Sequence, residues 1–171
     1  MKKLTLFFSL MCSMVLFMND SKAQVSVGAN VGFFKFFDAD AQLGFNISGK
    51  YAINKQMNVG MNLGYYSKST SVFGNRISFI TMPITGLFEY NFTGKDFRPY
   101  VGADLGLYRL AFSGGIGNSI GGGYFGLAPV VGFNYSLSKK LSLNSNLKYH
   151  YVMSDFSTSA IGLNVGVVLK F

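Results

Sequence analysis

Three residues near the end of the chain are of the types that carry acid and base chemistry. His150 is the only histidine among the 171 residues, and Ser154 and Asp155 follow it closely. A histidine acts as a general base only when its ring nitrogen lies about 3 Å from the hydroxyl that it activates, and closeness along the chain does not establish that distance. A hydrogen-bonded histidine inside the fold is the competing interpretation.

A second group consists of five charged residues of mixed sign, each within a stretch where apolar and polar residues alternate: Lys50, Glu89, Asp104, Lys148 and Lys170. If they face the interior, they must be partnered, because a buried charge is tolerated only when it is paired and hydrogen-bonded. We therefore expect an internal network of ion pairs and hydrogen bonds. A path for protons or ions is the functional alternative.

Other motifs point away from cofactor chemistry. The glycine-rich stretch "SGGIGNSIGGG", residues 113–123, lacks the Gly-Lys-Ser/Thr ending of a phosphate-binding loop and is interpreted as a flexible connection between strands. The single cysteine, Cys12, lies in the apolar N-terminal run. We predict no cofactor, no metal site and no catalytic residue.

The N-terminal residues have the features of a secretory signal. Lys2 and Lys3 are followed by an apolar run over residues 4–18 and by a small-residue site that ends at Ala23. We expect residues 1–23 to be cleaved and residues 24–171 to form one domain. An uncleaved anchor is the alternative, but the run is shorter than the roughly 20 residues of a spanning helix. The net charge of +8 would suit nucleic acid, yet an exported chain has little nucleic acid to bind, so none is predicted as a partner.

The elements that must position these residues are strands. Apolar residues recur at every second position in eight segments of about ten residues, namely 25–33, 43–53, 57–65, 80–92, 101–107, 125–137, 141–151 and 161–171. Tight turns are expected at 54–56, 93–97 and 138–140, and longer loops at 34–40, 67–76, 111–123 and 153–158. Pro83 and Pro129 fall inside segments, where each removes a ladder donor, so we expect bulges or interrupted pairing there. The pattern predicts an all-β, eight-stranded antiparallel up-and-down barrel.

The volume of the apolar side chains decides which face of each strand points outward. The residues at the apolar positions of the alternation, which we call the apolar phase, number roughly forty, and an eight-stranded barrel is only just wide enough for its own interior side chains. The opposite phase is rich in glycine and asparagine, which suit a narrow lumen. Charged residues make up only 13% of the chain, against about 25% in soluble proteins. We therefore expect the apolar phase to face lipid, with aromatic residues near the strand ends as interfacial girdles. A soluble lipocalin-type barrel is the alternative.

The chain also resembles a known family. The paired stretches "FITMPITGLFEYNF" and "RPYVGADLGLY" and the closing "IGLNVGVVLKF" are similar to those of small eight-stranded outer-membrane barrels of the OmpA-like and OmpX-like kind, especially the Bacteroidetes-type outer membrane protein beta-barrel domains. The resemblance implies the outer membrane of a Gram-negative bacterium, with outer-membrane lipids and the barrel assembly machinery as partners. It also implies an assembly signal in the last strand, carried by Leu163, Val165, Val167, Leu169 and Phe171.

The resemblance leaves several functions open. Our leading expectation is a non-enzymatic barrel with a filled polar lumen, serving as a structural element of the membrane or binding an adhesion target or partner through its extracellular loops. Some barrels of this kind modify lipid A, and one type uses a histidine, a serine and an acid, which would direct attention to His150, Ser154 and Asp155. A barrel subunit of a larger envelope machine is the third possibility. OmpA-like proteins often carry a peptidoglycan-binding domain after the barrel, and no such domain is predicted here.

Overall fold

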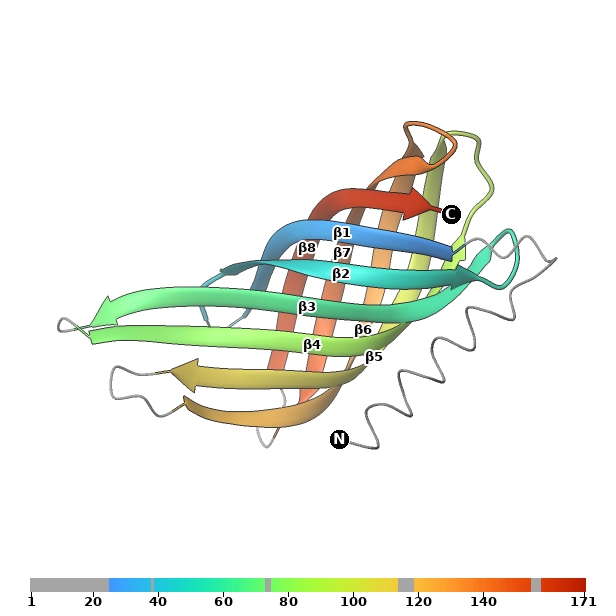
Figure 1. Cartoon of the computed structure of the whole chain (residues 1–171). Helices are drawn as coiled ribbons and strands as arrows, with labels where there is room; N and C mark the ends of the chain where they lie inside the picture. Colours follow the sequence, from blue (N-terminus) through green and yellow to red (C-terminus); the bar gives the residue numbers. More distant parts are fainter. Residues whose placement is uncertain (1–24, 38, 73–74, 114–118, 155–157) are drawn as a thin grey trace, which may run out of the picture.

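The chain forms a closed antiparallel barrel of eight strands in sequence order (Figure 1). The computed structural model describes residues 25–37, 39–72, 75–113, 119–154 and 158–171, so the predicted signal peptide lies outside it. The strands are β1 (Val25–Phe36), β2 (Gln42–Ala52), β3 (Met57–Val72), β4 (Asn75–Asn91), β5 (Phe97–Ser113), β6 (Ser119–Ser136), β7 (Leu141–Met153) and β8 (Thr158–Lys170). This confirms the predicted fold. Within the described residues, no helix is long and apolar enough to span a membrane.

Closure brings the first and the last strand together. β8 pairs with β1 over eleven positions, from Ser26 opposite Lys170 to Phe36 opposite Ala160. The backbone N–H of Phe171 then donates to the carbonyl of Val25 at 2.9 Å. The sheet therefore has no free edge, which is how strands satisfy their backbone groups in lipid.

Short turns connect the strands at the end of the barrel where β1 begins and β8 ends. The Asn54 side-chain oxygen accepts the N–H groups of Gln56 and Met57, each at 2.8 Å. The Ser138 hydroxyl accepts the N–H of Leu141 at 3.1 Å. Asparagine and serine close such turns because their short side chains replace a backbone acceptor. The three turns occupy the predicted places, at residues 53–56, 92–96 and 137–140.

The apolar phase faces outward, as expected. Leu43, Val31 and Leu105 expose 73%, 68% and 54% of their surface. Aromatic side chains stand at both ends of this outer surface, for example Phe125 and Tyr135 on β6. Ten residues separate these two, which is about 33 Å along a strand and about 25 Å along the axis of a barrel with strands tilted by about 40°. That height matches the apolar band of outer-membrane barrels.

Two of the four predicted long loops, 67–76 and 111–123, are mostly strand among their described residues. β3 continues to Val72 and β4 begins at Asn75, and β5 and β6 also pair far into the predicted loop 111–123. β1 likewise runs to Phe36. Strands β3 to β6 have 16 to 18 residues, whereas the other four have 11 to 13, and in Figure 1 the β3–β4 hairpin extends well past β1 and β2. The predicted boundaries of these two loops were wrong because the outward phase stops being apolar at these positions while the backbone ladder continues. The predicted loop 153–158 agrees with the end of β7 at Met153 and the start of β8 at Thr158.

The polarity of the two faces changes in this extension. On β3 the outward phase passes from Leu63 and Tyr65 to Ser67, Ser69 and Ser71. On β4 and β5 the inward phase passes from Thr85 and Asp104 to Phe79, Leu110 and Phe112. A face that contacts lipid is apolar and a face that contacts water is polar, so the reversal indicates that these strand ends stand in water above the membrane.

The two prolines that were predicted to interrupt strands, Pro83 and Pro129, each interrupt one ladder without changing its register. Between β3 and β4 the ladder runs to Leu63 opposite Ile84 and resumes at Tyr66 opposite Thr81, skipping Pro83. The ladder between β6 and β7 is interrupted in the same way at Pro129. The prediction of interrupted pairing is confirmed, whereas a bulge would have shifted the register and is not present at either position.

Candidate functional site

Two buried ion pairs lie in the lumen. The Lys50 Nζ is 2.6 Å from Glu89 Oε1, joining β2 to β4, and the Lys148 Nζ is 2.6 Å from Asp104 Oδ2, joining β7 to β5. All four side chains are at least nine-tenths buried. Thr85 adds a longer hydroxyl contact of 3.4 Å to Asp104 Oδ2. The barrel wall thus brings together four of the five charged residues that the sequence singled out, and pairs each with the opposite sign.

A chain of asparagine side chains runs around the lumen beside these pairs. Each amide in it donates to the next through bonds of 2.9 to 3.1 Å, in the sequence Asn30 to Asn46, Asn46 to Asn164, Asn164 to Asn146, Asn146 to Asn144 and Asn144 to Asn134. Asparagine suits this position because one side chain both donates and accepts. The chain links β1, β2, β6, β7 and β8 through side chains as well as backbone.

Nearer the outer end, a buried cluster closes the lumen. Phe34, Tyr66, Tyr108, Val152 and Ala160 come from five different strands, and each is at most 4% exposed. We call these five residues the plug. The Tyr66 hydroxyl reaches down to Asn164 Oδ1 at 2.7 Å and so joins the plug to the asparagine chain. The cavities on the two sides of the plug share no lining residue.

His150 belongs to this buried region. Its Nδ1 lies 2.8 Å from the Tyr108 hydroxyl, and its ring packs 4.5 Å from that of Phe34. The side chain is 4% exposed and points into the lumen, away from the lipid-facing surface. Ser154 lies beyond the end of β7, and Asp155 lies outside the described residues. The geometry of His150 is that of a hydrogen-bonded interior histidine.

Sequence reasoning missed the large aromatic side chains of the interior. Phe34 lies at the next inward position after Gly28, Asn30 and Gly32. It would have been found if the strand predicted over 25–33 had been extended by one residue. Inward glycines make room for such rings. Tyr100 stands directly opposite Gly132, where an added Cβ would come within 2.7 Å of the tyrosine ring. Tyrosine and glycine therefore form complementary pairs across neighbouring strands.

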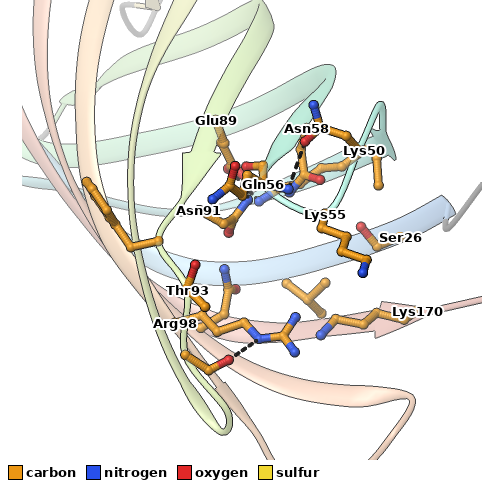
Figure 2. A pocket seen from close by; sticks show the side chains of 16 residues that line it. Ser26, Lys50, Lys55, Gln56, Asn58, Glu89, Asn91, Thr93, Arg98 and Lys170 are labelled. Atoms are coloured by element: carbon orange, nitrogen blue, oxygen red, sulfur yellow. Dashed lines mark hydrogen bonds and ion pairs between the residues drawn. The ribbon is translucent and has the colours of Figure 1, made fainter.

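At the short-turn end the lumen opens into a vestibule of about 550 Å³ (Figure 2). The Arg98 Nε donates to the carbonyls of Gly94 at 3.1 Å and Lys95 at 3.3 Å, which fixes the guanidinium. Figure 2 shows it extended toward the amine of Lys170, with Lys55 above. Of the charged groups in the described part of the chain, no carboxylate pairs with Arg98, Lys170 or Lys55. The vestibule thus carries positive charge that an anion could neutralise.

Lys170 differs from the other four charged residues in its pairing, although it lines the same vestibule as Lys50 and Glu89. It lies at the mouth, half-buried beside another cation, and makes no ion pair with a described residue. The side chains of Leu163, Val165, Val167 and Leu169 all point outward from β8, and Phe171 is 73% exposed just beyond it. The residues named as an assembly signal thus form one continuous apolar stripe on the outer wall.

The chain matches known proteins in both sequence pattern and fold. A family model described as "Outer membrane protein beta-barrel domain" matches residues 4–171. Neisserial surface protein A superposes with a TM-score of 0.70 at 20% identity, over 88% of this chain and 98% of that one. Ail of Yersinia pestis gives 0.63 at 15%, over 88% and 100%, and the N-terminal barrel of Pseudomonas aeruginosa OprF gives 0.57 at 18%, also over 88% and 100%. No curated protein sequence matches significantly.

These similarities agree with the apolar outer wall and the polar interior, and they exclude the soluble lipocalin-type alternative. The outward face contacts lipid, the short turns and the vestibule lie at the periplasmic end, and the extended strands lie at the extracellular end. The chain belongs to the family of outer membrane protein beta-barrel domains and resides in the outer membrane.

Proposed function

We propose that this barrel is a non-enzymatic, non-conducting protein that binds a partner through the extracellular extension of strands β3 to β6. The observation that carries the proposal is the reversal of polarity above the membrane band. A strand crosses the membrane with about 9–11 residues, and these four strands have 16 to 18. Their additional residues build a sheet in water that the barrel does not need for spanning.

The outward surface of this extension suits protein or glycan contact. Ser69 and Ser78 stand opposite each other with hydroxyl oxygens 2.8 Å apart, and Arg109 is exposed on the neighbouring strand. A sheet surface rich in hydroxyl groups offers hydrogen-bond donors and acceptors at fixed spacing, with little side-chain entropy to lose on binding. Among proteins of similar fold, Ail, an attachment invasion locus protein, has been solved with a heparin analogue, which supports looking for an extracellular ligand.

The filled lumen supports a role other than transport. The plug, the asparagine chain and the two ion pairs occupy successive levels of the interior, and an eight-stranded barrel has no spare width around them. We propose no catalytic role for His150, because its ring lies behind the barrel wall with Tyr108 and Phe34, away from any lipid substrate.

The proposal is tested by shortening one hairpin. Replacing residues 70–77 with Asn-Gly joins Ser69 and Ser78, which already face each other, through a favoured two-residue turn. Both barrels are produced in a non-adherent bacterial host and assayed on immobilised glycans and matrix proteins. A Lys139→Ala/Lys140→Ala variant at the periplasmic turn is the control.

We expect the intact barrel and the control to adhere to at least one surface and the shortened barrel to lose that adhesion while still running as a folded barrel on unheated gels. Equal adhesion of the shortened barrel, or no adhesion by the intact one, contradicts the proposal. Stoichiometric co-purification of an envelope protein with both barrels would instead favour a subunit of a larger machine.

A further inference from the structure

The outer mouth of the lumen contains a cavity of about 420 Å³ above the plug. It lies inside the extended strands, whereas the proposed partner surface lies on their outside, so the two can be tested separately. Its volume falls within the range of small-molecule sites, roughly 300–1,000 Å³. We call it the cup.

The walls of the cup are apolar although they stand in water. Phe79 and Phe112 are directly opposite each other on β4 and β5, and their rings meet edge to face at 4.8 Å. They remain 49% and 38% exposed. Phe36 lines another part of the cup and packs on Phe34 of the plug at 5.0 Å. Inward-facing rings that are left half-exposed provide apolar surface that a ligand would bury.

The floor of the cup holds an unsatisfied polar group. Gln42 stands opposite Phe34 of the plug and is 4% exposed, yet its Oε1 has no hydrogen-bond partner among the residues that the structure describes. Thr81, 1% exposed, also lines the cup. A buried acceptor without a donor is costly, and a ligand that brings a donor to the floor removes that cost.

The charges at the rim cancel. Lys68 Nζ and Asp40 Oδ2 form an ion pair of 2.8 Å at the cup's edge. Among the described residues that line the cup, these are the two that carry charge. A charged ligand would therefore have to enter an apolar space without a free counter-charge.

We propose that the cup binds an uncharged small molecule with a compact apolar body and one hydroxyl or N–H group, with that donor directed at Gln42 Oε1 and the body held between Phe36, Phe79 and Phe112. The depth of Gln42 sets the orientation, because the donor must enter first. The apolar walls set the affinity, and the single acceptor sets the preference among ligands of equal size.

The test uses 1-adamantanol, which has one hydroxyl, and adamantane, which has the same body without it. The natural chain contains no tryptophan, so Thr70→Trp at the exposed rim supplies a fluorescent reporter in the full-length barrel in lipid nanodiscs. A Lys139→Trp barrel places the same reporter at an exposed position of a periplasmic turn, outside the vestibule, and measures the response caused by probe dissolved in lipid.

We expect 1-adamantanol to shift the emission of the Thr70→Trp barrel saturably and to leave that of the Lys139→Trp barrel unchanged. Adding Gln42→Leu should weaken 1-adamantanol binding by roughly 3- to 10-fold, the value of one hydrogen bond, and leave adamantane binding unchanged. Adding Phe79→Ala, at a half-exposed position that the fold tolerates, should weaken both probes. Gel migration of unheated samples confirms folding.

Three results overturn the proposal. A Thr70→Trp barrel that does not respond shows that the cup is closed or filled by the chain itself. Equal responses at the two reporter positions show partitioning into lipid only. If Gln42→Leu leaves 1-adamantanol binding unchanged, or weakens both probes equally, Gln42 does not recognise the donor.

Discussion

The buried ion pair between Asp104 and Lys148 provides the sharpest test of the filled lumen. At 2.6 Å, the attraction between unit charges is about 6 kcal/mol if the effective dielectric constant is about 20. Removing both charges from water costs several kcal/mol per ion, so the pair as a whole adds little net stability. Removing one partner is different, because the other charge then stays buried alone, at a cost of about 3–5 kcal/mol.

We therefore expect Asp104→Asn and Lys148→Met each to lower the free energy of unfolding by about 3–5 kcal/mol, and the double variant to be more stable than the sum of the two losses predicts. Equilibrium unfolding by urea of the barrel in lipid vesicles, followed by far-UV circular dichroism, measures all four proteins. The exposed pair of Asp40 and Lys68 is the matched control, and Lys68→Met should leave the unfolding midpoint almost unchanged.

Two results would refute this reasoning. Losses below about 1 kcal/mol for both single variants would mean that water reaches the charges, and the lumen would then be wet. Strict additivity in the double variant would mean that Asp104 and Lys148 do not interact in the membrane, whatever their individual losses.

Further predictions concern packing, the rim and assembly. Gly132→Val should lower the free energy of unfolding by about 1–3 kcal/mol, because the larger side chain overpacks the lumen. Gly49→Val should not lower it, because a Cβ added at Gly49 meets no described atom within 4 Å. The midpoints of unfolding in urea distinguish the two variants. The hydrogen bond and charge of Lys68 hold the pKa of Asp40 below its usual 3.8. The ion pair between Asp40 and Lys68 should therefore be complete above pH 3.8 and be lost as the pH falls through the lowered pKa of Asp40. An NMR titration of the Asp40 carboxyl carbon measures that pKa, and Lys68→Met should raise it. Deleting Phe171 should slow barrel formation in cells, seen by pulse-chase on unheated gels, more than refolding in detergent; an unchanged rate in cells would remove its role as an assembly signal.

Alternation was enough to predict the fold because each strand faces two different environments. Neighbouring residues such as Leu63 and Asn62 must point to opposite faces of the strand. Because one face contacts lipid and the other a crowded lumen, the apolar residue points outward and the polar one inward. The same reasoning placed Lys50 and Lys148 inside. It could not pair them with Glu89 and Asp104, because pairing across the lumen depends on strand tilt and stagger, which the residue pattern does not encode.

The parts that sequence reasoning missed share one cause. Apolar residues alternate with polar ones only where one face of a strand contacts lipid. The alternation therefore ends at the membrane surface even where the strand continues. Ser67 and Ser71 were therefore assigned to a loop, and Phe79 and Phe112 could not be recognised as the walls of a cup. Gln42 gave no signal by itself, since only its burial without a partner makes it notable.

Conductance across a planar lipid bilayer tests whether the lumen is closed. Purified barrel, shown to be folded by its gel migration, is inserted and recorded at increasing voltage. We predict no stable current steps, because the plug of Phe34, Tyr66, Tyr108, Val152 and Ala160 separates the vestibule from the cup. Reproducible, long-lived channels of uniform conductance would contradict this account.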